Sequence, residues 1–439
     1  MRPEDRSTRS AVTLPPMLRS TGLMGNMADF LNDPVQMFRT GYEQHGPVFG
    51  IRLAHMKGCV VVGADRQQRF YDEIDRRLSV AKLYKFVIPM FGSVALAQPD
   101  VERRIAQVRL LHRAFAENRM KAHLAVMTQE ADLAMGELGE RGGADLWELC
   151  ERFAIRVSAS ALLGPEVRQD IDRLVPMLDD LARGMEFVLP PWLPLPRFIR
   201  RDSARRRLRT WIQPMLDERR AHPRDPRDFL QVLVDGDRED RNGGADLVGI
   251  TLLTLFTGYI TTAASMAWLI SDVLDQPKLH ERLQHEVRRD PSTAARSSLV
   301  ANTILESIRK NPVMSHYARI VEEPIVVDDY TVPKGWQLIV VPSLAHQEAT
   351  HFPNPEAFDP DRFHTAGGLD RPPVFLGFSA GQYRCPGRVF GLAELACLLV
   401  EMLRRFEVRY HRTGRSPSMD RGVIRPPDRA LLVEPVPRT

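Results

Sequence analysis

The sequence has few cysteines, and they lack the spacings typical of disulfide frameworks or zinc sites. Four occur in 439 residues, at Cys59, Cys150, Cys385 and Cys397, and no two form a Cys-x-x-Cys pair. Neither a disulfide scaffold nor a structural zinc site is therefore indicated. Each cysteine has to be interpreted from its own surroundings.

A large charge of one sign is also absent. The chain has 60 basic and 56 acidic residues and a formal net charge of +4. That excess is too small to imply binding to nucleic acid. Arginine clusters such as Arg200-Arg201 lie within helical patterns, where a solvated face is the usual explanation.

An apolar signal core is missing from the first twenty residues, so we expect a soluble, cytoplasmic protein that does not act at a membrane. Residues 247–271 contain no charged side chain and are long enough to cross a bilayer. However, this stretch is rich in threonine and is bounded by Asp246 and Asp272 rather than by basic anchors. We predict a buried central helix.

Helical periodicity dominates what is present, and 44% of the residues are hydrophobic, enough for a large core. Predicted helices cover residues 33–44, 101–115, 119–138, 146–163, 170–185, 202–220, 229–234, 246–274, 280–288, 299–310 and 386–406. Predicted strands cover 48–53, 59–62, 320–327 and 338–341. The fold class is therefore mainly α with a minor β-sheet, with an irregular segment over residues 1–25.

The stretch 375–387 is where we expect the chemistry, because it surrounds Cys385 with special residues. A cysteine directly before a proline at a helix start lies near free backbone N–H groups and the positive helix end, which favour a metal-binding thiolate. Gly381 allows a tight turn, and Gly387 leaves room for a flat cofactor against the chain. Phe378 is expected to cover the other side of the sulfur.

Two other interpretations of this stretch stay open. A free cysteine is often a small buried hydrophobe. In addition, residues 377–381 match the Gly-x-Ser-x-Gly nucleophile elbow of serine hydrolases, with Ser379 as nucleophile. That elbow requires a downstream histidine, and His411 is the one histidine after Ser379, but no strong strand precedes the serine.

The spacing Phe-x-x-Gly-x-x-x-Cys-x-Gly from Phe378 to Gly387 resembles the haem-thiolate loop of the cytochrome P450 family. The resemblance implies that Cys385 is the metal ligand, binding the iron of haem b. The haem would be held non-covalently, since no Cys-x-x-Cys-His is present. Two residues before the cysteine the family has a basic residue on a haem propionate; Tyr383 stands there instead, and its hydroxyl is expected to bond the propionate.

Other motifs agree with this resemblance. Glu306 and Arg309 resemble the family's Glu-x-x-Arg, and residues 358–363 resemble its Pro-x-Arg-Phe element. The resemblance implies that Arg362 joins Glu306 and Arg309 in a buried network behind the haem. Taken alone, an i,i+3 pair is more often a surface salt bridge. The further propionate contacts implied by the family are Arg319, Arg109 and Tyr84.

Residues 81–92 look like the substrate-loop signature of the sterol demethylase branch. The resemblance implies that this loop lines the substrate cavity through Phe86, Val87 and Phe91, with core packing as the alternative. His316, in what is otherwise an apolar wall in that branch, either faces a polar substrate group or is a core histidine. A polar role would favour an oxygenated terpenoid or another specialised metabolite over a bare sterol.

The predicted buried helix departs from the family pattern in the run Thr257-Gly258-Tyr259-Ile260-Thr261-Thr262. The family has an acid, or in sterol demethylases a histidine, before the threonine matching Thr261, and the pair relays protons. Ile260 cannot carry a proton, so water, Thr262 or the substrate is expected to replace it. The resemblance also places three residues at the site: Gly258 beside the cofactor, and Tyr259 and Ile260 toward the substrate.

We therefore expect a single P450 domain over residues 1–439, inserting one oxygen atom of O2 into a hydrophobic small molecule. Electrons are expected from NAD(P)H through a ferredoxin reductase and a ferredoxin, which docks near Arg384 and Arg388. One alternative is oxidation without hydroxylation, by desaturation, ring formation or rearrangement. A serine hydrolase using Ser379 is a further alternative.

Overall fold

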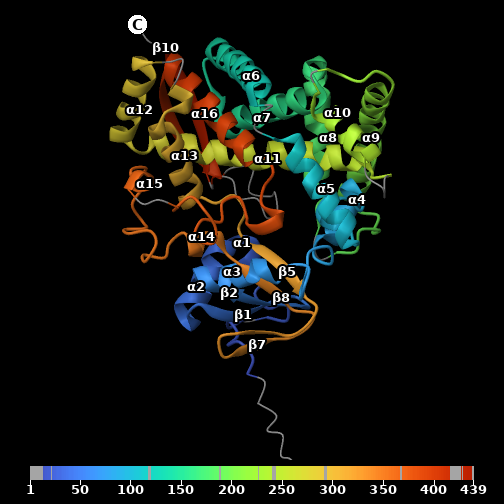
Figure 1. Ribbon diagram of the computed structural model, residues 1–439. Coiled ribbons are helices and arrows are strands. Elements are labelled where there is room, and N and C mark those ends of the chain that lie inside the picture. The colour runs from blue at the N-terminus through green and yellow to red at the C-terminus, as the bar shows by residue number, and fades with distance from the viewer. Residues whose placement is uncertain are drawn as a thin grey trace, which may run out of the picture.

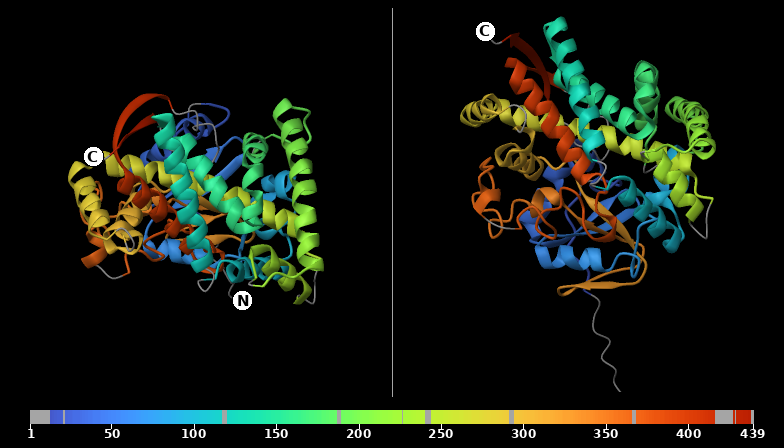
Figure 2. Two further views of the ribbon diagram at one scale, coloured as in Figure 1. Left: turned by 90° about the horizontal axis from the view of Figure 1, so that it is seen from above. Right: turned by 45° about the horizontal axis from the view of Figure 1, so that its top comes forward.

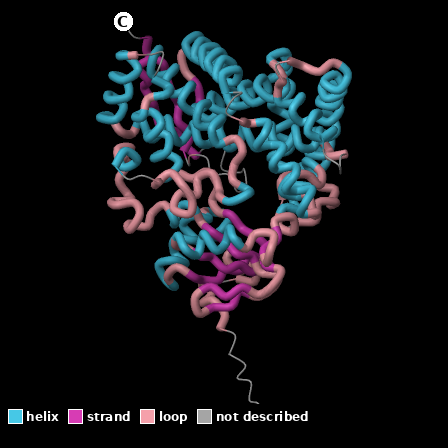
Figure 3. Tube along the Cα trace, viewed as in Figure 1, coloured by secondary structure: helices cyan, strands magenta, loops and turns pink. Residues whose placement is uncertain are grey.

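The structure, a computed structural model, describes residues 13–20, 22–116, 120–186, 189–225, 227–239, 244–290, 294–365, 368–415, 427 and 429–437. A larger helical part and a smaller part that contains most of the strands make up the molecule (Figure 1, Figure 3). The mainly α fold class with a minor sheet is therefore confirmed.

Helices supply most of the core. In chain order they are α1 (Met27–Asn32), α2 (Pro34–His45), α3 (Ala64–Asp72), α4 (Ile88–Phe91), α5 (Val101–Ala114), α6 (Met120–Arg141), α7 (Leu146–Leu163), α8 (Ile171–Arg183), α9 (Pro196–Ala221), α10 (Phe229–Glu239), α11 (Leu247–Leu274), α12 (Pro277–Arg289), α13 (Ser298–Lys310), α14 (Pro342–Ala345), α15 (Arg362–Thr365) and α16 (Arg388–Arg405).

Within the described ranges the strands form three sheets. They are β1 (Val48–Leu53), β2 (Met56–Val61), β3 (Leu78–Ser79), β4 (Ala144–Asp145), β5 (Tyr317–Val321), β6 (Ile325–Val327), β7 (Tyr330–Val332), β8 (Gln337–Val340), β9 (Phe406–Arg415) and β10 (Arg429–Pro437). The largest sheet has the order β1-β2-β8-β5-β3, and its β2–β8 pair is parallel. The others are β4-β10-β9 and the hairpin β6-β7.

α11 crosses the helical part as its central helix (Figure 1). Asp246 caps it by accepting a hydrogen bond from the backbone N–H of Gly249 at 2.9 Å. Within the described residues α11 is the one helix long and apolar enough to cross a membrane, and 72% of its most apolar window is buried in the protein. The burial confirms the predicted core helix.

Several elements were not predicted from the sequence. The helix α3 was missed, and so were β9 and β10, which pair antiparallel from Phe406↔Pro437 onward. These two strands lie beside α16 and α6 (Figure 2). Of the predicted irregular segment 1–25, residues 1–12 and 21 lie outside the described residues.

Candidate active site

The loop that leads to Cys385 is closed by its own backbone. The N–H of Cys385 donates to the carbonyl of Phe378 at 2.9 Å, and the N–H of Arg384 donates to that of Gly381 at 3.3 Å. Gly381 has a φ of +63°, which favours glycine. The loop therefore turns where the sequence predicts, and α16 begins at Arg388, directly after it.

Cys385 differs from the other three cysteines in being exposed, whereas Cys59, Cys150 and Cys397 are buried. Desolvation by nearby protein atoms raises the pKa of its thiol, while the backbone N–H of Gly387 and the charge of Arg388 lower it. A Cβ at Gly387 would have the sulfur, 3.9 Å away, as its near neighbour. The glycine thus leaves open space beside an accessible sulfur.

Tyr383 is held by a charged cluster that the sequence did not predict. Its hydroxyl accepts a hydrogen bond from Nε of Arg104 at 2.8 Å and donates to Asp75. Arg104 is 2% exposed and forms an ion pair with Asp75 at 2.6 Å. The expected propionate bond of Tyr383 therefore competes with Asp75 for the hydroxyl proton.

The three other predicted propionate residues lie on different elements. Arg319 on β5 is 2% exposed; its Nη1 donates to the carbonyl of Ala318 at 2.6 Å, whereas its Nε is buried without a hydrogen-bond partner. Its guanidinium lies 5.7 Å from the ring centre of Tyr84. Arg109 on α5 is exposed. A buried donor without a partner costs free energy, so binding an acceptor next to the Nε of Arg319 would be favourable.

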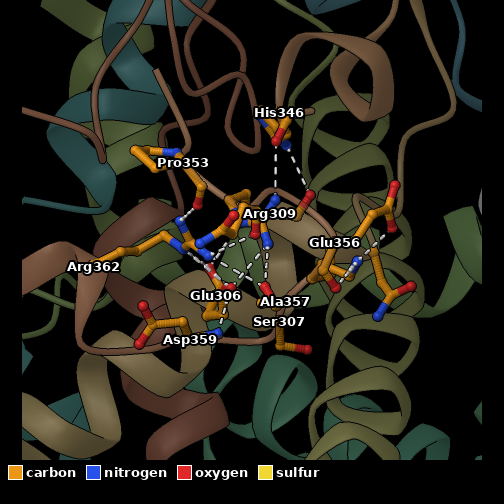
Figure 4. Close-up of polar contacts among 12 residues, drawn as sticks. Glu306, Ser307, Arg309, His346, Pro353, Glu356, Ala357, Asp359 and Arg362 are labelled. Atoms are coloured by element: carbon orange, nitrogen blue, oxygen red, sulfur yellow. Dashed lines mark hydrogen bonds and ion pairs between the residues drawn. The ribbon is translucent and has the colours of Figure 1, made fainter. Parts of the chain in front are cut away.

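Glu306, Arg309 and Arg362 form the predicted network (Figure 4). Both Glu306 oxygens accept from Arg309, at 2.7 and 2.8 Å, and Arg362 Nε lies 3.2 Å from the carboxylate. All three side chains are buried. The Nη groups of Arg309 and Arg362 also donate to backbone carbonyls, among them those of His346, Pro353 and Ala357. The network therefore ties α13 to the irregular chain that precedes the Cys385 loop.

His346 connects this network to the loop itself. Its Nε2 accepts a hydrogen bond from the N–H of Leu376 at 2.8 Å, so its Nδ1 carries the proton and donates to the carbonyl of Arg309 at 3.1 Å. The ring stacks on Phe375 with a centre separation of 4.9 Å. His346 therefore positions the first residues of the Cys385 loop, a role that the sequence interpretation missed.

The neutral state of His346 predicts a specific pH dependence. Burial lowers its pKa from 6.5 to about 3, and the charge of Arg309 acts in the same direction. Between these values the unfolded chain binds a proton that the folded chain does not, so His346 loses its stabilising contribution as pH falls from 6.5. We expect the free energy of unfolding to fall less steeply between pH 7 and 4 in His346→Asn than in the wild type. The free energy of unfolding is measured by urea titration at each pH. An equal change of that free energy with pH in both proteins would contradict this assignment.

One face of α11 carries a row of hydroxyl groups. Thr261 Oγ1 donates to the carbonyl of Thr257 at 2.7 Å, Thr257 Oγ1 donates to that of Leu253 at 2.8 Å, and Ser265 Oγ donates to that of Thr261 at 2.9 Å. Thr257 is exposed and Thr261 and Ser265 are half-buried, whereas Thr262 is buried. Thr257 therefore joins Thr261 on the accessible face, which the sequence interpretation did not foresee.

The neighbouring predicted residues of α11 point elsewhere. Tyr259 and Ile260 are 1% and 0% exposed, and the Tyr259 ring packs edge-on against Phe256 at 5.7 Å. A Cβ at Gly258 would lie 3.3 Å from Ser158 Oγ on α7, so the glycine allows close helix packing. The structure does not bring Tyr259 or Ile260 to the accessible face, because both fill the core around α11.

The predicted substrate loop likewise has one partly accessible residue and two buried ones. Phe86 is half-buried and stacks on Tyr84 at 5.7 Å, whereas Val87 and Phe91 are 7% and 1% exposed. Phe91 packs on Phe256 of α11 at 5.3 Å, which is core packing. Of these three predicted substrate residues, Phe86 is the one with substantial accessible surface.

His316 lies against the N-terminal helices. Its ring is 5.6 Å from that of Phe30 on α1 and 5.7 Å from that of Phe38 on α2, and Nδ1 is 2.9 Å from Ser315 Oγ. Burial lowers its pKa to about 4. These contacts agree with the alternative of a neutral histidine packed among aromatic rings.

Ser379 has no hydrolase surroundings. Its hydroxyl contacts that of Tyr71 at 3.4 Å, and no strand leads into its turn. His411 lies on β9, where it is exposed and 3.8 Å from Glu434 of the neighbouring strand. The nucleophile-elbow alternative therefore fails, because neither the strand nor a histidine partner is in place.

The family model for cytochrome P450 matches residues 15–433. This chain belongs to the cytochrome P450 family. It is accordingly a haem monooxygenase, an oxidoreductase, as the resemblance of the Cys385 loop implied.

Known P450 proteins are similar to this chain over most of its length. Sterol 14alpha-demethylase of Mycolicibacterium vanbaalenii is 27% identical over 403 residues, which make up 87% of this chain and 88% of that protein. Sterol 14-demethylase of Arabidopsis thaliana is 27% identical over 419 residues, covering 90% and 86%. The solved structure of retinoic acid-bound cyanobacterial CYP120A1 superposes with a TM-score of 0.84 at 20% identity, covering 97% of this chain and 100% of that one. The last likeness shows the fold alone.

The residues of this P450 fit the haem that its family implies. The accessible sulfur of Cys385, with free space beside Gly387, suits a ring stacked against the loop. The orphaned Nε of Arg319 suits a carboxylate such as a haem propionate. The chain thus supplies both a soft sulfur ligand, which binds a metal as the thiolate, and a buried cation with an unused donor.

Proposed function

We propose that this P450 inserts one oxygen atom of O2 into a hydrophobic small molecule of terpenoid or steroid-like class, in the biosynthesis of a specialised metabolite. The observation that carries the proposal is the accessible Cys385 sulfur in a loop of the family's spacing. Two relatives named sterol 14-demethylases support an apolar polycyclic substrate. The absence of an ionisable residue at Ile260 argues against the same reaction.

Cys385 would hold the iron of haem b, with Gly387 leaving room for the ring and Phe378 in the same loop. Arg319 would bind a propionate through its free Nε, and Tyr84 and Arg109 are the further candidates. When bound, the haem supplies the one-electron and dioxygen chemistry that side chains lack. The rest of the mechanism falls to residues that bind the substrate, exclude water and deliver protons.

Electron delivery is proposed to use a ferredoxin and its reductase, with NAD(P)H as the source. Arg384 beside Cys385 is exposed, and its charge contributes to lowering the pKa of His112 on α5. Arg388 pairs with Asp370 at 2.9 Å, so it is already partly neutralised. Arg384 is therefore the stronger candidate for contact with an acidic partner. We further propose a single domain that works in the cytoplasm.

Proton delivery in this chain is proposed to use Thr257 together with Thr261. Each hydroxyl donates its proton to a backbone carbonyl, which leaves oxygen lone pairs free to accept from water. Because Thr257 and Thr261 are four residues apart on one accessible helix face, a single water molecule can bridge them. Thr257 and Thr261 would hold this water in turn, and protons arriving from solvent would pass through it, rather than through an acid at position 260, to convert the second oxygen atom to water.

The test begins with binding titrations of apolar polycyclic compounds, followed through the haem spectrum, and continues with the best ligand as substrate. We expect Thr257→Val to lower the ratio of product to NAD(P)H consumed by about tenfold, less than the roughly 10²–10⁴-fold of a direct general acid, because Thr261 still holds the water. Thr257→Ser restores the hydroxyl and is expected to recover most of the ratio. Ile260→Asp is expected to lower Tm without improving the ratio, because the carboxyl would enter packed core.

An unchanged ratio in Thr257→Val, or an improved one in Ile260→Asp, would contradict this proton route. Isotope-labelled O2 in the same assay distinguishes hydroxylation from the alternative, oxidation without hydroxylation. Desaturation also uses one O2, two electrons and two protons, but it removes two hydrogen atoms from the substrate and releases both oxygen atoms as water. A product that carries no label would therefore show that the enzyme carries out the non-hydroxylating oxidation instead of hydroxylation.

A further inference from the structure

A cavity lies where β3 meets the segment leading into α5. Its volume is about 460 Å³, within the range of small-molecule sites. Apolar side chains contribute much of its lining: Leu78, Ala81, Ile88, Ala97 and Val101. No residue of the Cys385 loop lines it, so this cavity, called the β3 pocket below, is separate from the proposed haem site.

The charges of the β3 pocket do not balance. Two ion pairs account for four of its six charged side chains: Arg104 with Asp75, and Lys82 with Glu322, each at 2.6 Å. The remaining two, Arg76 and Lys85, are exposed, and neither has an ion-pair partner among the residues that the structure describes. The pocket therefore presents two unmatched positive charges beside an apolar lining.

One wall of the β3 pocket, formed by Arg104 and Asp75, contacts the Cys385 loop. Arg104 donates to the Tyr383 hydroxyl at 2.8 Å, and Asp75 accepts from the side chain of Gln382 at 2.8 Å. Both loop residues lie within three positions of Cys385. The wall is rigid for the same reason, since Arg104 and Asp75 are buried and already paired.

We infer that the β3 pocket binds a small organic anion with an apolar body, an aryl or alkyl carboxylate being the simplest case. The carboxylate would pair with Arg76 and Lys85 at the mouth, while the apolar body covers Leu78 and Ile88. A dianion without an apolar part would leave the lining uncovered, and a neutral compound would leave both cations unmatched. The internal pair of Arg104 and Asp75 needs no ligand group.

Calorimetric titration of the haem-loaded protein with 4-phenylbutyrate and its neutral amide tests this inference. We expect the acid to bind one site, more weakly as ionic strength rises, and the amide to bind on the order of tenfold more weakly. The double variant R76E/K85E is expected to weaken binding of the acid by tenfold or more. The control R206E/K278E changes the net charge equally at two exposed positions outside the pocket and is expected to bind like the wild type.

Two results would overturn the inference. One is no heat of binding for the acid with wild type at millimolar concentration. The other is equal affinity in R76E/K85E and wild type, as expected if the probe entered the substrate cavity instead. Because the readout is binding heat and not turnover, the outcome is independent of the proposed substrate and proton route.

Discussion

Replacing Glu306 by glutamine is expected to lower the free energy of unfolding by about 3–5 kcal/mol. The carboxylate is fully buried and is the one anion between the guanidinium groups of Arg309 and Arg362. It also accepts the backbone N–H of Asp359 at 2.7 Å. Glutamine keeps the volume but leaves two buried cations without a counter-charge, which is far costlier than losing one hydrogen bond.

A surface ion pair provides the matched control. Arg282 binds Asp361 through two hydrogen bonds, at 2.8 and 3.0 Å, but both side chains are about half exposed. Asp361→Asn is therefore expected to change stability by less than about 1 kcal/mol. Urea unfolding of the haem-loaded wild type and both variants makes the comparison. Similar losses in Glu306→Gln and Asp361→Asn would show that the buried network does not brace the fold.

Replacing Cys385 by alanine is expected to reduce turnover by more than about a hundredfold, since even a residue beside a metal ligand often costs that much. The thiolate is the one soft anionic ligand that the loop offers, and no other cysteine in the chain is exposed. Cys397→Ala is the control, because Cys397 lies on the following helix α16 and is buried at 8% exposure. Its turnover is expected to stay within a few-fold of wild type.

Spectra and turnover have to be measured on the same preparations, with haem content determined for each. Turnover in Cys385→Ala equal to that of Cys397→Ala would remove the cysteine from the reaction. Loss of turnover in both variants, with normal haem content, would assign the effect to α16 packing instead.

Local sequence signals predicted the turn of the loop and the shared helix face of Glu306 and Arg309, but not the burial of their network. Gly381 was expected in a tight turn because of its conformational freedom, and its φ of +63° agrees. The spacing of Glu306 and Arg309 on a helix fixes them on one face. Whether that face is buried was supplied by the family resemblance and not by the spacing.

Contacts between distant segments could not be predicted in this way. Tyr383 meets Arg104 and Asp75 from positions 279 and 308 residues away. His346 joins Arg309 and Leu376 only after β8 and the chain following it have been placed. No local periodicity encodes such meetings.

α11 shows a second limit. Because this helix is apolar on nearly all sides, its sequence does not reveal which face looks toward solvent-accessible space. Ile260 and Tyr259 were assigned to the substrate by resemblance, yet the core buries them and leaves Thr257 accessible. The strand β9 was missed although Phe406, Val408 and Tyr410 alternate with polar residues, as in a half-buried strand. In β10 the alternation is broken by a run of four apolar residues, and Pro435 and Pro437 argue against a strand.

The central claim is that a deprotonated Cys385 sulfur binds the haem iron, and one absorption spectrum tests it most directly. The purified, haem-loaded wild type is reduced, exposed to carbon monoxide and scanned. A main band shifted far to the red, lost in Cys385→Ala and kept in Cys397→Ala, is the predicted result. A reduced carbon monoxide complex of wild type without that red shift, or protein that takes up no haem, would contradict the account.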